Sequence, residues 1–164
     1  MFVREATAAD WPGIWPIWHR IAVEGETIAW RADTGYDQAR ASWLLDPPGR
    51  TYVAHDGGRI IGSAQLKPHY GPSSHVANAS FIVDPDRRGQ GIGRALAHHV
   101  LGRARDEGYR SMVFNAVVET NHGAVRLYRS LGFRILTTVP DAFAHPRHGL
   151  VGMHVMYLPL EDRR

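Results

Sequence analysis

A strand-like run ends at Asp84-Pro85, and three alternating glycines, Gly89, Gly91 and Gly93, follow it where a helix begins. From Ile92 onward, apolar residues recur at helical spacing. The first N–H groups of such a helix have no partner inside it, so they point into the glycine-rich turn. Together with the positive end of the helix dipole they bind anions, phosphate above all. The chain is therefore expected to build a β–α unit around an anion site.

The residues around the glycines narrow the choice of anion. Glycine lets the backbone approach a ligand closely, and Arg88 and Arg94 can add charge-assisted hydrogen bonds. The phosphate loop of NTPases requires Gly-Lys followed by Ser or Thr, which this turn lacks. A dinucleotide-binding turn requires a third glycine where Arg94 stands, and it belongs in the first β–α unit rather than in mid-chain. Both nucleotide interpretations are therefore weak.

The rest of the chain alternates between strand and helix patterns. Strand-like runs cover residues 2–5, 51–55, 60–67, 75–83, 112–118, 133–139 and 151–158, and helical patterns cover 7–21, 36–45, 91–104 and 121–131. Asp56-Gly57-Gly58 joins two of the strands as a hairpin. This order predicts an α/β fold in a single domain, residues 1–164, with a mixed, mostly antiparallel sheet and helices on its faces.

Composition limits the class of protein. The 164 residues are 44% hydrophobic, which suffices for a core, and the absence of Cys excludes disulfides and a thiolate nucleophile. None of the 10 His has the H-E-x-x-H spacing, so no metal is expected. No signal-like N-terminus or long apolar run occurs, and the net charge is only +3. We expect a cytoplasmic protein that binds neither membrane nor nucleic acid, with a homodimer left open.

Two motifs resemble those of a known family. Arg88-x-x-Gly91-x-Gly93 after Val83-Asp84-Pro85 resembles the pyrophosphate loop of the GCN5-related N-acetyltransferases, the GNAT family. Asn121-x-x-Ala124-x-x-Leu127-Tyr128-x-x-Leu131-Gly132-Phe133 resembles the second signature of that family, in the expected order. The order of strands and helices along nearly the whole chain also matches. The resemblance implies the GNAT fold, in which two central strands splay apart.

The resemblance further implies acetyl-CoA as the cosubstrate. The splayed strands would be residues 77–83 and 112–118, and the pantetheine arm would bond to free backbone groups near Phe81 and Val83. A backbone N–H near Val83 would then hold the thioester oxygen. The implied cofactor-binding residues are Phe81, Val83, Arg88, Gly89, Gly91, Gly93, Arg94, Asn121 and Tyr128.

Tyr128 is the implied general acid, because a phenol can donate a proton to the departing thiolate. The alternative is that Tyr128 only packs in the apolar stripe of its helix. The general base stays open, since the strand at 76–83 carries no acid. The candidates are Glu26, Glu119, His75 and water. Glu26 lies beside Thr27 and Trp30 in the loop that covers the acceptor pocket in this family.

Asn78 and Asn115 stand in strands, where Asn is disfavoured, so each is expected to meet a specific hydrogen-bonding need. With Asn121 they resemble, more weakly, the fungal branch of the family that acetylates proline analogues. That likeness implies that Asn78 and Asn115 orient a small amine or its carboxylate. The alternative is that each asparagine only satisfies an irregularity of its strand. The expected activity is acetylation of a small-molecule amine; a protein acetyltransferase and a non-catalytic acyl-CoA sensor are the alternatives.

Overall fold

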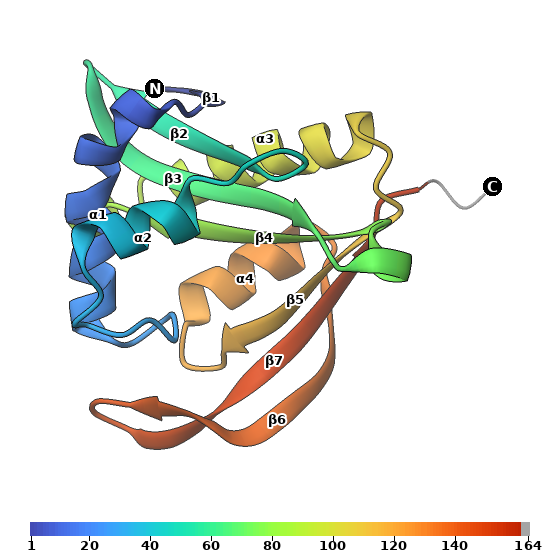
Figure 1. Cartoon of the computed structure of the whole chain (residues 1–164). Coiled ribbons are helices and arrows are strands. Elements are labelled where there is room, and N and C mark those ends of the chain that lie inside the picture. Colours follow the sequence, from blue (N-terminus) through green and yellow to red (C-terminus); the bar gives the residue numbers. More distant parts are fainter. Residues whose placement is uncertain (162–164) are drawn as a thin grey trace.

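One seven-stranded sheet runs through the computed structural model, which describes residues 1–161 (Figure 1). The strands are β1 (Phe2–Glu5), β2 (Arg50–Asp56), β3 (Arg59–Pro68), β4 (Val76–Val83), β5 (Ser111–Val118), β6 (Arg134–His145) and β7 (Gly149–Pro159). Their spatial order is β1-β2-β3-β4-β5-β7-β6. Only the β4–β5 pair is parallel, and every other neighbouring pair is antiparallel. The predicted mixed, mostly antiparallel sheet is thus confirmed.

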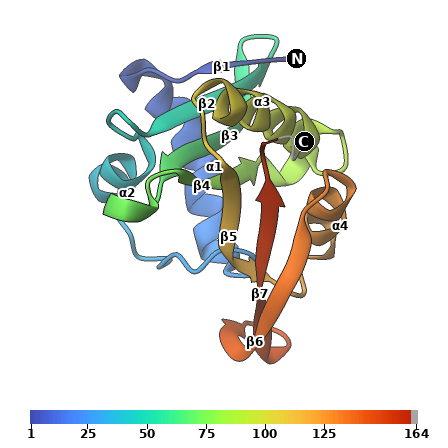
Figure 2. The same ribbon diagram turned by 90° about the vertical axis from the view of Figure 1, so that its right-hand side faces the viewer.

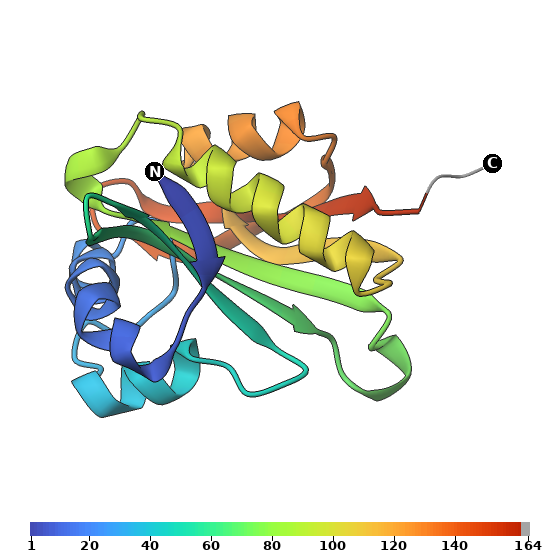
Figure 3. The same ribbon diagram turned by 90° about the horizontal axis from the view of Figure 1, so that it is seen from above.

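Helices cover both faces of the sheet, as predicted (Figure 3). They are α1 (Trp11–Glu24), α2 (Tyr36–Trp43), α3 (Ile92–Asp106) and α4 (His122–Ser130). Because side chains of a strand alternate between faces, each face of the sheet carries a hydrophobic core. One core forms under α1 and α2, where Trp11, Trp18 and Trp43 are almost fully buried. The other forms under α3 and contains Leu66, Leu96 and Met112.

β4 and β5 part shortly after they meet. They pair only at Val76 with Ser111 and at Ala77 with Met112, whereas β4 stays paired with β3 up to Val83. Figure 1 shows β5 turning away from β4 toward the lower part of the molecule. The splayed central strands expected from the resemblance are therefore present.

The β6–β7 hairpin is longer than the sequence predicts. The strand expected at 133–139 continues to His145, past a register shift between Val139 and Phe143. Asp141 adopts a φ of 52° inside this shift, so the chain forms a bulge after Val139 and the strand does not end there. The hairpin extends beyond the rest of the sheet (Figures 1 and 2). Within residues 1–161, no helix has the length and apolar character needed to cross a membrane.

Candidate active site

A cavity of about 670 Å³ opens where β4 and β5 separate. The predicted cofactor-binding residues, Asn78, Asn115 and Tyr128 all line it, whereas the base candidates Glu26, Glu119 and His75 do not; the lining members are Asn78, Phe81, Val83, Arg88, Gly89, Gly91, Gly93, Arg94, Asn115, Asn121 and Tyr128. They come from β4, the turn before α3, the first turn of α3, β5, and the N-cap and middle of α4. Thr27, Ile28, Ala29 and Trp30, from the loop between α1 and α2, close one end.

The glycine-rich turn leads into α3 with its N–H groups free. Gly89 and Gly91 have φ values of 76° and 80°, which residues with a Cβ rarely adopt. The first bond inside the helix runs from Ala95 N to Gly91 O at 3.0 Å, and no side chain caps the helix start. The N–H groups of Ile92, Gly93 and Arg94 are thus available to an anion in the cavity.

A short 3-10 turn, η3 (Pro85–Arg87), holds this segment in place. The Asp84 carboxylate accepts the Asp86 N–H at 3.0 Å and pairs with Arg59 at 3.1 Å. Asp84 is almost fully buried, so these contacts compensate the cost of removing its charge from water. These two contacts stabilise the turn between the end of β4 and the glycines.

The free edge of β4 faces the cavity. Asp84 N bonds to Ile61 O and His69 N bonds to Val76 O, both at 2.9 Å, on the β3 side. Antiparallel pairing alternates, so the even-numbered residues of β4 bond to β3 and the odd-numbered ones direct N–H and C=O toward β5. Beyond Ala77 the odd-numbered residues Ala79, Phe81 and Val83 have no β5 partner. The Ala79 N–H bonds to Asn78 Oδ1, so the backbone groups of Phe81 and Val83 are the ones that can bind an extended ligand.

Tyr128 lies on α4 among aromatic rings at the floor of the cavity. Its ring centroid is 4.7 Å from that of Phe114 and 6.1 Å from that of Phe81. Burial raises the pKa of the Tyr128 phenol. The hydroxyl therefore stays protonated at neutral pH and can only act as a hydrogen-bond or proton donor to an anionic leaving group.

The base candidates lie outside the cavity lining. Glu26 Oε1 pairs with Arg147 at 2.8 Å, and Glu119 Oε1 accepts the N–H of Gly152 at 2.6 Å. His75 precedes β4 and lines a separate cavity beside Arg110, at the opposite end of the strand. The structure therefore does not bring Glu26, Glu119 or His75 to the splay. Among the described residues that line the main cavity there is no carboxylate or imidazole.

Asn78 and Asn115 do share the cavity, and each also stands at a strand irregularity. Asn78 Oδ1 accepts the Ala79 N–H at 2.9 Å, at the first residue beyond the β4–β5 pairing. Asn115 is exposed at a register shift between Phe114 and Val117. The geometry is thus compatible with a role of these asparagines in orienting the acceptor and also with a role limited to their strands. Sequence reasoning missed Ser80, although the two-residue period of β4 places it on the same face as Asn78.

Trp30 gives the end of the cavity beside the α1–α2 loop a rigid wall. It stacks on Trp18 at a centroid distance of 4.3 Å and meets the edge of Trp43 at 5.6 Å. Both partners are almost fully buried. Aromatic pairs in these geometries add stability beyond their burial, so the loop that carries Trp30 is held against the buried residues Trp18 and Trp43.

Comparison with known proteins gives consistent matches. The family model described as "Acetyltransferase (GNAT) family" matches residues 11–133. The solved structure of a GCN5-related N-acetyltransferase from Kribbella flavida is similar over 96% of both chains, with 50% identity and a TM-score of 0.93. The L-methionine sulfoximine/L-methionine sulfone acetyltransferase of Pseudomonas aeruginosa is 34% identical over 147 residues, which are 85% of this chain and 83% of that protein.

The N-acetyltransferase aca1 of Schizosaccharomyces pombe is 40% identical over 84 residues. That match covers 51% of this chain but 40% of the yeast protein. The chain thus corresponds to less than half of this longer relative.

Proposed function

The chain belongs to the Acetyltransferase (GNAT) family, an acyl-CoA-dependent N-acetyltransferase family, and we propose that it transfers the acetyl group of acetyl-CoA to a small amino-acid-like amine. One observation carries this proposal. A single cavity joins the free helix start of α3, the unpaired edge of β4, and the polar and aromatic groups of Asn78, Asn115 and Trp30. An anion site, a strand-like slot and an acceptor pocket are thus connected.

The residues present fit acetyl-CoA. The N–H groups of Gly93 and Arg94 and the side chain of Arg88 would hold the diphosphate, since they combine backbone donors with positive charge. The free backbone groups of Phe81 and Val83 would bind the amide-containing arm as an added strand does. A Val83 N–H donating to the thioester oxygen would stabilise the negative charge that develops there.

Acetyl transfer needs an amine with a free electron pair. The amine nitrogen forms a bond to the thioester carbon, and the carbon–sulfur bond breaks. The Tyr128 hydroxyl would donate its hydrogen bond or proton to the departing sulfur. As the described cavity lining carries no carboxylate or imidazole, the acceptor would enter as the free amine or lose its proton to water.

Two features favour a small acceptor. Asn78 and Asn115 face one cavity and offer amide donors and acceptors, which suit a carboxylate next to an amine. The relative from Pseudomonas aeruginosa, which is similar over most of both chains, is named for acetylation of L-methionine sulfoximine and L-methionine sulfone. An amino acid analogue is therefore the acceptor class that we propose.

An acceptor panel tests the proposal. The purified chain is incubated with acetyl-CoA, and thiol release is followed with methionine sulfoximine, methionine sulfone, proline analogues, polyamines and short peptides as acceptors. We expect turnover with amino acid analogues and little with peptides or polyamines. Turnover confined to peptides would overturn the small-molecule assignment. Stabilisation by acetyl-CoA without turnover on any acceptor would instead support an acyl-CoA sensor.

A further inference from the structure

Arg88, one of the residues placed at the diphosphate, is held by a side chain from a distant part of the sequence. Its Nη2 lies 2.7 Å from Oε2 of Glu24, the last residue of α1. The Glu24 side chain is 29% exposed, whereas that of Arg88 is 54% exposed. The more buried carboxylate at the end of a helix therefore pairs with the guanidinium of a loop.

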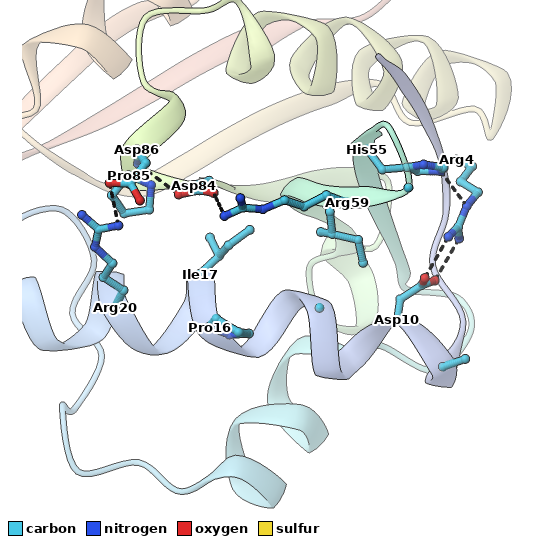
Figure 4. A pocket seen from close by; sticks show the side chains of 14 residues that line it. Arg4, Asp10, Pro16, Ile17, Arg20, His55, Arg59, Asp84, Pro85 and Asp86 are labelled. Carbon is cyan, nitrogen blue, oxygen red and sulfur yellow. Dashed lines mark hydrogen bonds and ion pairs between the residues drawn. The ribbon is translucent and has the colours of Figure 1, made fainter.

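Glu24 is itself part of a chain of ion pairs. Arg20, one turn earlier in α1, lies 3.7 Å from Glu24 and 2.9 Å from Asp86 in η3. Figure 4 shows Arg20 and Asp86 facing each other at one end of a second cavity of about 660 Å³. The series Asp86, Arg20, Glu24 and Arg88 thus runs from η3 through α1 to the glycine-rich turn.

The ion pairs that line the second cavity have a structural role. Figure 4 shows Arg59 bound to Asp84 in its middle and Arg4 bound to Asp10 at its far end, at 3.1 and 2.8 Å. The arginines drawn there all pair with aspartates, so they are engaged with the protein itself. These contacts fix η3 against α1 and β3, and Glu24 extends them to Arg88.

We propose that Glu24 is a positioning residue for the acyl-CoA diphosphate. A guanidinium has five N–H donors, and the contact with Glu24 uses one of them. The remaining donors can bind phosphate while Glu24 keeps the side chain beside the glycine-rich turn. Arg88 then loses less conformational freedom when the ligand binds. This inference rests on the proposed use of acyl-CoA.

The test compares Glu24→Gln with the parent chain on two acetyl donors. Acetyl-CoA carries the diphosphate, and S-acetylpantetheine does not. We expect the Kd and KM for acetyl-CoA to rise about threefold to tenfold with kcat at saturation unchanged, as a lost charge-assisted contact predicts. With S-acetylpantetheine the variant and the parent should behave alike. In an Arg88→Gln background, Glu24→Gln should add no further loss, because the two residues act as a pair.

Glu107→Gln is the matched control. Glu107 pairs with Arg50 and Arg103 just beyond the other end of α3, about 20 Å from the glycine-rich turn. Glu107→Gln removes the same charge as Glu24→Gln and should leave the acetyl-CoA affinity unchanged.

Three results would overturn the inference: an unchanged acetyl-CoA affinity in Glu24→Gln, a tighter affinity, or an equal loss with S-acetylpantetheine. A tighter affinity would mean that Glu24 competes with phosphate for Arg88. Equal loss on both donors would mean a general structural effect. If the parent chain binds no acetyl-CoA at all, the proposed function fails before Glu24 is tested.

Discussion

Arg147 Nη1 lies 2.8 Å from Glu26 Oε1, and this ion pair connects the tip of the β6–β7 hairpin to the loop between α1 and α2. The next residues of that loop, Thr27 to Trp30, line the end of the cavity where we propose that the acceptor binds. Glu26 itself does not line the cavity. Its position suits an anchor for the acceptor loop better than a proton acceptor.

Arg147→Gln and Glu26→Gln separate these two roles. If the pair anchors the loop, each variant should raise the KM for the acceptor about twofold to fivefold and leave kcat near that of the parent, because exposed ion pairs contribute little. A general base would instead cost about 100-fold or more in kcat for Glu26→Gln alone. Steady-state kinetics on the best acceptor distinguishes the outcomes. Arg31→Gln, which breaks an exposed pair with Asp33 within the same loop, is the control.

Tyr128→Phe should lower kcat by about 100-fold while the Kd for acetyl-CoA stays near that of the parent, since general acids contribute on that order. The substitution keeps the ring against Phe114 and removes only the hydroxyl. Because burial raises the pKa of Tyr128, the phenol remains protonated through pH 9, and we expect no loss of activity there from its ionisation. Rapid-mixing turnover and calorimetric binding would check both parts. A variant with the parent's kcat would reduce Tyr128 to a packing role.

The sequence allowed most of the cavity lining to be predicted, because the required features are local. Positive φ at Gly89 and Gly91 and a helix starting behind them follow from glycine spacing and helical periodicity. The splay between β4 and β5 came from the family resemblance and not from any residue pattern. It depends on pairing between segments about 35 residues apart in the chain, which local propensity does not encode.

The differences between the sequence-based expectations and the structure have the same physical origin. His75 stands next to β4 in sequence, but the parallel register with β5 puts it at the paired end, away from the splay. The strand predicted to end at Val139 continues, because cross-strand pairing with β7 resumes at Phe143. In both cases the pairing register between strands decides where the residues lie, and that register depends on tertiary structure.

Gly91→Asp should abolish acetyl-CoA binding, because it places a carboxylate where phosphate is expected. Gly57→Asp is a close control: both glycines have positive φ, and a Cβ at either would meet open space. The two variants should therefore suffer similar backbone strain, about 1–2 kcal/mol. Thermal melting without acetyl-CoA measures the strain, and the rise in Tm on adding acetyl-CoA measures binding. Equal ligand-induced stabilisation in the two variants would contradict the anion site.

Asp10→Asn tests the Arg4–Asp10 ion pair, which connects β1 to the start of α1. Two hydrogen bonds of 2.8 Å from Arg4 are the main cause of an Asp10 pKa lowered to about 2. A carboxyl whose pKa is lowered by folding stabilises the protein above its unfolded pKa, and this stabilisation is lost as the pH falls from about 4 toward 2. Urea unfolding should show a loss of about 2 kcal/mol at pH 7 that disappears near pH 2. A loss independent of pH would exclude the ion pair as its cause.

Asn115→Ala and two substitutions of Asn78 separate acceptor binding from strand support. Asn115 is exposed in the cavity, so its loss should raise the acceptor KM about tenfold without changing the Tm. Asn78→Ala leaves the Ala79 N–H without its 2.9 Å partner and should cost about 1–3 kcal/mol of stability. Asn78→Asp keeps an oxygen for that N–H but adds negative charge to the cavity. It should retain the stability while raising the KM for a carboxylate-bearing acceptor, because like charges repel. If Asn78→Asp and Asn115→Ala both leave the acceptor KM unchanged, these asparagines serve the strands and not the substrate.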